Sequence, residues 1–351
     1  MHTPRILHVT EAMGGGTAAA IAEFARSTPQ YEHHLLGRVR PGSETATAAD
    51  FAVSHPAGRG LAGFVLAVRR AVTRARPAVV HLHSSWAGLA GRLLLAPGGP
   101  AVAYTPHCFA FERDPATTPP GLVRAARRAE RALAGRTRLA ICVSPREADL
   151  AAALGLAAVH VPNTTRVRGP RELPADPAPE VVTVGRIGAQ KDPHFLLRVK
   201  ALVTADAAWT WVGGGDPALE AQLRAAGVEV TGWLPPDRVG DRLAAAGAYL
   251  HTAAWESCPL ALLEAVAAGL PLVARSIPAL DSLGLDPALR TPEQVAAELE
   301  LVLRTGQPSR PRLQEAFAAR HTPQAQASAL TAAYEWLLDA AVRAGVPVPV
   351  G

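Results

Sequence analysis

YLHTAAWESCPLALLEAVAAGLPLVAR, residues 249–275, is the stretch that decides the fold. A short apolar run at 248–250 predicts a buried strand, and a polar loop follows at 251–258. A helix is expected over residues 259–268, because this segment begins with proline and is followed by a capping glycine. A second buried strand is expected at 270–274. Strand, loop, helix and strand in this order predict one unit of a parallel sheet.

Two carboxylates flank the start of this predicted helix. Glu256 lies just before it and Glu264 lies within it. The unpaired N–H groups at the helix start, around Pro259 and Leu260, favour an anion. Carboxylates at that position would repel a bare phosphate, but they would accept hydrogen bonds from neutral hydroxyls on either side of a phosphate. The pattern therefore suggests that the ligand is a nucleotide-sugar.

Length and composition predict a two-domain globular protein. The chain has 351 residues, of which 49% are apolar and 19% are charged. No apolar run is long enough to span a membrane, and the N-terminus lacks a signal-peptide pattern, so we expect a cytoplasmic protein. The three cysteines, Cys108, Cys142 and Cys258, have no paired spacing that would indicate a disulfide framework or a zinc site. We expect neither a metal nor a cofactor.

Charge is spread unevenly along the chain. Up to Arg168 there are 20 arginines and 10 acidic residues, whereas the remainder has 15 basic and 20 acidic residues. A basic first half suggests that this half faces something anionic. The expected helix 121–134 presents four arginines, Arg124, Arg127, Arg128 and Arg131. They form either an ordinary solvated face or a patch for an anionic membrane surface or an acidic acceptor.

Strands and helices alternate through the first half, and the residues at the strand ends are the candidates for ligand contact. Gly15 and Gly16 lie in a glycine turn between a strand, 5–10, and a helix that ends near 27. This turn is either a phosphate cradle or a tight turn without a ligand, and its spacing does not match the dinucleotide fingerprint. His107 follows the strand 101–105 and is a candidate for contact at the reaction centre.

The second half repeats the alternation after a proline-rich segment, 164–179. Arg186 and Lys191 flank a loop after the strand 181–184, where two cations would clamp a diphosphate. The next strand ends carry Gly213, Gly214 and Trp233. These three residues could form a slot for a nucleobase, although ordinary packing also explains the tryptophan.

Together these positions resemble those of the large family of retaining glycosyltransferases with the GT-B fold, family 4 or glycosyl transferases group 1. The most specific segments are ESCPLALLEAVAAGLP at 256–271 and VGRIGAQKD at 184–192. HLHSSWAGLAGR at 81–92 and YTPHCFAF at 104–111 are similar to the branch that builds bacterial surface polysaccharides from lipid-linked acceptors.

The resemblance implies an α/β architecture of two Rossmann-like domains, with parallel sheets facing across a cleft and a C-terminal helix that crosses back to the first domain. The expected boundaries are an acceptor-side domain at 1–168, a linker at 169–179, a donor-nucleotide domain at 180–322 and the returning helix at 323–351.

The resemblance also implies a role for each matching position. Arg186 and Lys191 match residues that hold the donor diphosphate, together with Gly15, Gly16 and the backbone at Pro259 and Leu260. Glu264 matches the carboxylate that binds the ribose. Glu256 matches the carboxylate near the transferred sugar, and His107 matches a histidine near the reaction centre, so these two are the catalytic candidates. Gly213, Gly214 and Trp233 are assigned to the nucleobase region.

The implied activity is metal-independent transfer of a sugar, with retention, from a nucleotide-diphosphate donor to an acceptor hydroxyl. The family favours a UDP-sugar as donor, and the acceptor is a lipid-linked saccharide or a small molecule, with no role for nucleic acid. Peripheral contact with the inner face of the membrane is expected if the four-arginine face binds anionic lipid. Two alternatives use the same fold, a non-catalytic partner subunit and a sugar-nucleotide 2-epimerase.

Overall fold

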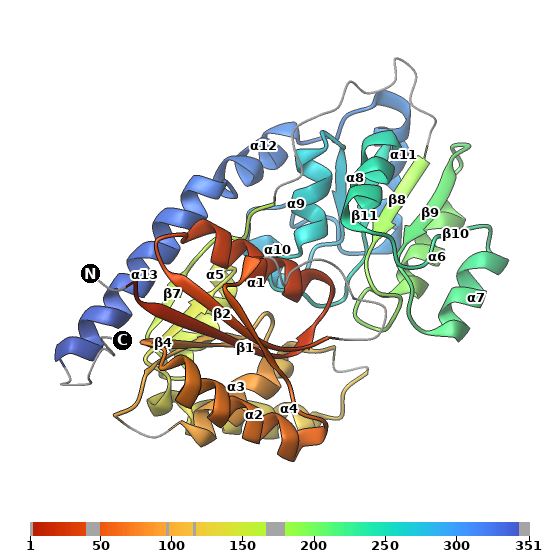
Figure 1. Cartoon of the computed structure of the whole chain (residues 1–351). Helices are drawn as coiled ribbons and strands as arrows, with labels where there is room; N and C mark the ends of the chain where they lie inside the picture. Colours follow the sequence, from red (N-terminus) through yellow and green to blue (C-terminus); the bar gives the residue numbers. More distant parts are fainter. Residues whose placement is uncertain (1–2, 40–49, 96–97, 115–116, 166–179, 344–351) are drawn as a thin grey trace. The chain divides into compact units, whose positions relative to one another are not determined.

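The computed structural model describes residues 3–39, 50–95, 98–114, 117–165 and 180–343. The chain divides into two compact units, the first made of Met1–Asn163 with Pro323–Gly351 and the second of Thr164–Thr322. Each unit has its own parallel sheet with helices around it, which confirms the predicted fold class (Figure 1). The predicted linker, 169–179, and the boundary at 168 lie outside the described residues.

The sheet of the first unit has the strand order β3-β2-β1-β4-β5-β6-β7, and every neighbouring pair is parallel. The strands are β1 (Arg5–Met13), β2 (Glu32–Val39), β3 (Val53–Pro56), β4 (Val79–His83), β5 (Ala101–Thr105), β6 (Leu139–Cys142) and β7 (Ala158–His160). The α-helices between them are α1 (Gly15–Ser27), α2 (Gly60–Ala75), α3 (Ser85–Leu94), α4 (Pro120–Ala132) and α5 (Pro145–Ala153). Two short 3-10 turns are η2 (Ala110–Glu112) and η3 (Ala134–Arg136).

The two faces of this sheet have different chemistry. One face is apolar, and its residues form a core with α2, α3 and α5 that includes Leu7, Val80 and Leu82. The other face carries buried histidines, among them His8 and His81, on the strand positions that alternate with the apolar ones. Each side of the sheet therefore has its own packing layer, one mostly apolar and the other rich in buried histidines.

The last helix, α13 (Pro323–Arg343), belongs to the first unit, as the resemblance predicted. It lies beside α1 and β5, and its residues Leu330, Tyr334 and Leu337 are buried. The side chain of Gln326 is buried as well, and its amide donates to the carbonyl oxygen of Pro162 over 3.0 Å. The first unit is therefore completed by a segment that follows the whole second unit in the sequence.

The sheet of the second unit has the order β10-β9-β8-β11-β12 and is also parallel. Its strands are β8 (Glu180–Val184), β9 (Ala208–Val212), β10 (Glu229–Val230), β11 (Ala248–His251) and β12 (Leu272–Ala274). Its helices are α6 (Pro193–Leu202), α7 (Pro217–Ala225), α8 (Pro236–Ala245), α9 (Leu260–Ala267), α10 (Pro278–Ser282), α11 (Pro292–Thr305) and α12 (Pro311–Arg320).

Some element limits differ from the sequence prediction. The strand expected at 50–54 is found at β3, and the segment expected as a loop around 277–280 begins the short helix α10. Pro259 precedes α9 with an extended backbone, ψ 123°, so the helix begins one residue later than expected. Among the described residues, no helix combines the length and the low charge that a membrane span requires.

Candidate active site

Three loops meet at the carboxyl edge of the second sheet, because the strands they follow, β9, β8 and β11, are neighbours in that sheet. The loop after β8 carries Arg186 and Lys191, the loop after β9 carries Gly213 and Gly214, and the loop after β11 carries Glu256. Parallel sheets place their ligand sites at this edge. The fold thus brings most of the predicted donor residues to one place.

Glycines allow two of these loops to approach backbone to backbone. A Cβ at Gly213 would lie 2.2 Å from the carbonyl oxygen of Gly185, and Gly213 has a φ of 137°, which side chains rarely adopt. The indole Nε1 of the buried Trp211 donates to the same Gly185 oxygen over 2.8 Å. The glycines that sequence analysis placed at these strand ends therefore have a packing role in the unliganded protein.

The loops after β8 and β11 are joined by hydrogen bonds. The Ala254 amide donates to the Gln190 carbonyl over 2.9 Å, and the Thr252 hydroxyl donates to the Lys191 carbonyl over 2.6 Å. The Gln190 side-chain amide also donates to the carbonyl of Trp255 over 3.2 Å. Residues 61 to 65 positions apart in sequence are thereby fixed against each other.

Lys191 and Glu256 form an ion pair, with 2.7 Å between Nζ and Oε1, and each side chain is only 13% exposed. The Lys191 side chain runs across Gly185, where an added Cβ would lie 2.7 Å from the lysine Cε. The hydrogen-bonded loops place the cation and the carboxylate in direct contact.

Glu264 lies on α9, the helix that begins just after the Glu256 loop. Burial raises the pKa of Glu264 to about 7, and the charge of Lys191 acts in the opposite direction. Pro259 and Leu260 are buried at the start of α9, and no side chain caps that end of the helix. A cation, a helix N-terminus and a carboxyl group that titrates near neutral pH are therefore adjacent.

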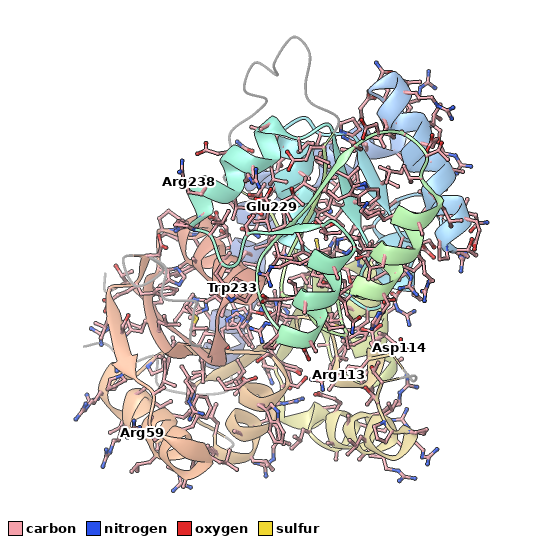
Figure 2. All side chains as sticks on the ribbon, turned by 90° about the vertical axis from the view of Figure 1, so that its right-hand side faces the viewer. Arg59, Arg113, Asp114, Glu229, Trp233 and Arg238 are labelled. Atoms are coloured by element: carbon pink, nitrogen blue, oxygen red, sulfur yellow. The ribbon has the colours of Figure 1, made fainter. Side chains whose placement is uncertain are left out.

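Trp233 lies in the loop after β10, is 43% exposed, and is labelled in Figure 2. The Arg186 guanidinium lies 5.9 Å from the centre of its ring. A Cβ at Gly214 would approach the Trp233 Nε1 to 3.2 Å. Ordinary core packing does not account for a tryptophan this exposed, and an exposed aromatic face beside a guanidinium is suited to stacking with a flat group.

Two residues in this region escaped sequence analysis. Asp192 has a left-handed backbone, φ 47°, and caps α6 by accepting from the Phe195 amide over 3.0 Å. Its other oxygen accepts from the Arg275 Nη1 over 2.8 Å. The Asp-Pro dipeptide at 192–193 is a helix-start signal and could have identified the cap. His251 ends β11 and is fully buried, and burial followed by the charge of Lys191 lowers its pKa well below the usual range.

In the first unit, Gly15 and Gly16 open the 13-residue helix α1. Gly14 precedes them, and no side chain caps this helix end. A Cβ at Gly16 would meet no atom within 4 Å, so packing within the described structure does not require glycine there. Free space above an uncapped helix start is compatible with the phosphate role, which no contact in the structure tests.

His107 lies in a strained turn after β5. His107 and the next residue, Cys108, both have left-handed backbones, with φ of 50° and 82°. The buried Glu147 holds this turn, because its carboxylate accepts from the Cys108 amide over 2.6 Å and from the Val143 amide over 2.9 Å. Glu147 was not predicted, although Ser144 and Glu147 have the spacing of a capping box at the start of α5.

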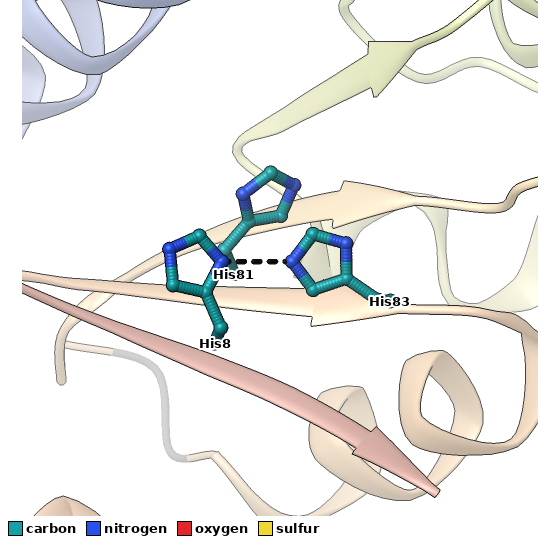
Figure 3. A group of neighbouring side chains, drawn as sticks. All are labelled: His8, His81 and His83. Carbon is teal, nitrogen blue, oxygen red and sulfur yellow. Dashed lines mark hydrogen bonds between the residues drawn. The ribbon is translucent and has the colours of Figure 1, made fainter. Parts of the chain in front are cut away.

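His107 is partly buried and is the end of a row whose other three histidines are buried. His83 Nε2 lies 2.9 Å from His8 Nδ1 (Figure 3). His107 Nε2 lies 3.1 Å from His83 Nδ1, and His8 Nε2 lies 2.9 Å from His33 Nδ1. Burial lowers the pKa of His107 to about 4, and burial is also the main cause that lowers the pKa of the other three. All four rings are therefore neutral at physiological pH. The pattern of histidines at alternate positions of neighbouring parallel strands could have revealed the row.

Glu11 lies near the end of β1 and is engaged within its own unit. Its carboxylate accepts from the Ser84 hydroxyl over 2.8 Å and from the Ala87 amide, at the start of α3, over 2.9 Å. It therefore occupies the positive end of α3 and has no need of a ligand there.

The four arginines of α4 are all exposed, whereas Glu130 on the same helix is buried. Glu130 accepts from the fully buried Arg92 over 2.8 Å and from the Tyr104 hydroxyl over 3.1 Å. The buried pair fixes which side of α4 faces the core, and the described structure shows no partner for the arginine face beyond a contact of Arg127 with the Phe111 ring.

Comparison with known proteins identifies the family. Residues 14–164 match the model described as "Glycosyltransferase Family 4", and residues 178–305 match the model described as "Glycosyl transferases group 1". A curated relative, an "uncharacterized 41.2 kDa protein in cps region" of Klebsiella pneumoniae, is 24% identical over 78% of this chain and 82% of its own length.

Solved structures share the fold. Sucrose-phosphate synthase from Thermosynechococcus elongatus aligns with a TM-score of 0.79 and 17% identity over 96% of this chain and 100% of its own. HepE from Anabaena, solved with UDP and glucose, aligns with a TM-score of 0.75 and 15% identity over the same shares of the two chains. The chain therefore belongs to glycosyltransferase family 4, the glycosyl transferases group 1, and is a glycosyltransferase with the GT-B fold.

Proposed function

We propose that the protein transfers a sugar, with retention and without a metal, from a UDP-sugar to an acceptor hydroxyl. The observation that carries this proposal is the Lys191–Glu256 ion pair beside the start of α9, with Glu264 on the same helix. A diphosphate needs the cation and the helix N-terminus, and the hydroxyls on either side of it need the carboxylates.

The ion pair holds together, in the unliganded protein, a cation for the diphosphate and a carboxylate for the sugar hydroxyls. Without donor, Lys191 and Glu256 neutralise each other at 13% exposure. A bound diphosphate would draw Lys191 Nζ toward its own oxygens, with Arg186 as the second cation. Glu256 would then be free to accept hydrogen bonds from the transferred sugar, and Glu264 would accept from the ribose hydroxyls.

The chemical step breaks the bond between the anomeric carbon and the diphosphate oxygen and forms a bond from that carbon to the acceptor oxygen. Negative charge develops on the departing phosphate, where Arg186, Lys191 and the α9 amides stabilise it. The acceptor hydroxyl attacks from the side that the phosphate leaves, and its proton passes to a phosphate oxygen. His107 is neutral, because burial lowers its pKa to about 4, and it contacts the sugar without receiving that proton.

The choice of UDP is supported by fold neighbours that were solved with UDP or UDP-glucose. The curated relative comes from a cps region, which supports an acceptor in surface-polysaccharide synthesis. We propose a lipid-linked saccharide as acceptor and a peripheral site on the inner face of the membrane, reached through Arg124, Arg127, Arg128 and Arg131.

Thermal shift and donor turnover with UDP-, GDP- and ADP-sugars test the donor. UDP-sugars should stabilise the protein most, turnover should survive a chelator, and the anomeric configuration of the product, read by NMR, should match that of the donor. Inversion at that carbon contradicts the retaining step. Release of a 2-epimer of the sugar, without transfer, would favour the epimerase, and a protein that no nucleotide stabilises would favour the partner subunit.

Flotation with anionic liposomes at low salt tests the membrane contact. Wild-type protein should float, and the double variant Arg124→Glu/Arg128→Glu should stay in solution. Arg69→Glu/Arg70→Glu is the matched control, because it reverses two exposed arginines on α2, outside the proposed patch. Equal loss in both variants would show that net charge, and not the α4 face, determines binding.

A further inference from the structure

The buried histidines of the first unit could be read as a metal site or as a hydrogen-bonded array. His8, His81 and His83 offer ring nitrogens within 4.8 Å of one another and are fully buried (Figure 3). However, both nitrogens of each ring are already engaged. His81 contacts the Tyr334 hydroxyl at 2.9 Å and the Thr105 hydroxyl at 2.8 Å, and His8 and His83 are members of the row described above. A metal would have to break several buried hydrogen bonds, so the array explains the geometry better.

The far end of the row determines where every proton lies. His33 Nε2 is 2.9 Å from the Thr28 carbonyl oxygen, which only accepts hydrogen bonds. It is also 3.1 Å from the Thr28 hydroxyl, which donates its own proton to the Phe24 carbonyl over 2.8 Å. Both Thr28 oxygens therefore require a proton on His33 Nε2, so that His33 Nδ1 carries a lone pair.

The same argument passes from ring to ring, because a neutral imidazole has one N–H and one lone pair. His33 Nδ1 accepts, so His8 Nε2 donates and His8 Nδ1 accepts. His83 Nε2 then donates to His8, and His83 Nδ1 accepts from His107 Nε2. His107 is left with its proton on Nε2, pointing into the row, and its lone pair on Nδ1.

We propose that this histidine row, His33–His8–His83–His107, is a tautomer lock that fixes His107 Nδ1 as a hydrogen-bond acceptor. His33, His8 and His83 are positioning residues, since they act on the site only through His107. The lock itself follows from the unliganded geometry, but its use rests on the proposed function. An acceptor at Nδ1 would bind a hydroxyl of the sugar or of the acceptor and would reject a group that only accepts.

The row ends at a carbonyl, so it holds protons and does not conduct them. The reversed arrangement would place the His33 Nε2 lone pair against the Thr28 carbonyl oxygen, and that repulsion favours the forward arrangement by at least about tenfold. Replacing His33 with phenylalanine removes both ring nitrogens, the Nε2 that faces the Thr28 carbonyl and the Nδ1 that accepts from His8. Forward and reversed arrangements of the remaining protons would then be nearly equal in free energy. The change is made at a residue that is three hydrogen bonds away from His107.

The experiment is ¹⁵N NMR of the imidazole rings in the full-length, unliganded protein. Wild type should show only the Nε2–H tautomer at all four histidines. His33→Phe should give a mixture at His107, whereas His33→Gln, whose amide can both accept from His8 and donate to Thr28, should restore a single tautomer. His34→Phe is the matched control, because His34 is the next residue on β2 and bonds to Glu32 and His55, outside the row.

Transfer activity gives a second, smaller readout. An equal mixture of tautomers should lower kcat/KM about twofold in His33→Phe, with recovery in His33→Gln. An Nδ1–H tautomer of His107 in wild type, a single Nε2–H tautomer in His33→Phe, or zinc bound at one equivalent by His8, His81 and His83 overturns the lock. If His33→Phe does not fold, the wild-type spectrum still tests the proposal, because it shows which nitrogen of His107 carries the proton. Absence of transfer with every donor would contradict the proposed function and leave the spectra unaffected.

Discussion

The two units place their candidate residues at the same kind of sheet edge but fix them by different physics. In the second unit, charges do the positioning, since the Lys191–Glu256 pair joins two loops. In the first unit, His107 is held by neutral imidazoles and by a turn clamped by Glu147. One edge is thus held by a charged pair, and the other by hydrogen bonds between neutral groups and a buried carboxylate.

Under the proposed function, this difference corresponds to what each edge would bind. A diphosphate carries charge, and an ion pair that can change partners lowers the cost of keeping the nearly buried Lys191 charged before the donor binds. A hydroxyl is neutral and directional, so a fixed tautomer is more useful than a charge. The comparison predicts that changes in the second unit act mainly through charge and pH, while changes in the first act through geometry.

The largest effect is expected at the charged edge. Lys191→Ala should lower kcat/KM by about 10²–10³-fold, because it removes a cation from the departing diphosphate and leaves Glu256 as an unpaired, nearly buried carboxylate. Steady-state kinetics measure the loss. Lys200→Ala is the control, because Lys200 is the other lysine of the chain, lies on α6 over the Trp209 ring, and should keep wild-type activity. A Lys191→Ala variant with normal kinetics would remove the charge-based half of the comparison.

A smaller effect is expected from the neutral edge. His107→Ala should lower kcat about 10–10²-fold, as for loss of one positioned hydrogen-bonding group. Glu147→Ala should lower kcat by a similar or smaller factor without touching substrate, because the two left-handed residues lose the carboxylate that holds them. The ¹⁵N NMR signals of the His107 ring should shift in Glu147→Ala, because the ring changes its position. Full activity in Glu147→Ala would mean that the turn keeps its shape without the clamp.

Glu264 should make donor binding dependent on pH. Burial raises the pKa of Glu264 to about 7, so the free protein holds a proton there more often below pH 7. If the carboxylate binds the ribose, the affinity for UDP should rise by about threefold to tenfold between pH 6 and 8, with release of a proton on binding. Titration calorimetry in buffers of different ionisation enthalpy measures both. Glu264→Gln should bind more weakly and lose the dependence; an unchanged profile in that variant assigns the titration to another group.

The raised pKa of Glu264 also makes the stability of the protein depend on pH. Stability should fall as pH rises, whereas the affinity for UDP should increase. The pKa of Glu264 is raised in the folded state, so its contribution is most favourable at low pH and is lost as pH rises through about 7. Glu264→Gln should therefore raise Tm more at pH 8 than at pH 5.

The smallest effect is expected at the glycine turn. Gly16→Ala adds a Cβ that meets no atom within 4 Å, so it should stabilise α1 by about 0.5–1 kcal/mol. If the donor phosphate approaches this backbone, KM should nevertheless rise a few-fold. Denaturant unfolding and kinetics measure the two changes separately. Gain in stability with unchanged KM would show that the donor does not reach Gly16.

Much of this architecture could be predicted from local sequence patterns. Alternating apolar runs and helices identified the parallel sheets, and the segment 256–271 located the carboxylates at the start of α9. Glycine and proline positions also indicated most element limits, because these residues restrict the backbone directly.

The contacts between distant residues could not be predicted in this way. The Lys191–Glu256 pair depends on hydrogen bonds between two loops more than 60 positions apart, and no local pattern encodes that pairing. The histidine row depends on the order in which parallel strands assemble, since β2, β1 and β4 must be neighbours before His33, His8 and His83 can meet.

The hydrogen bonds that join the loops after β8 and β11 have a consequence for sequence change. Two of their acceptors are the main-chain carbonyls of Gln190 and Lys191, and the Ala254 donor is also a main-chain group. The link from Ala254 does not depend on any side chain, and the link to Lys191 needs only the Thr252 hydroxyl, so Trp255 and Cys258 can vary without moving Lys191. Under the proposed function, the lysine that would hold the diphosphate therefore keeps its place while neighbouring side chains change.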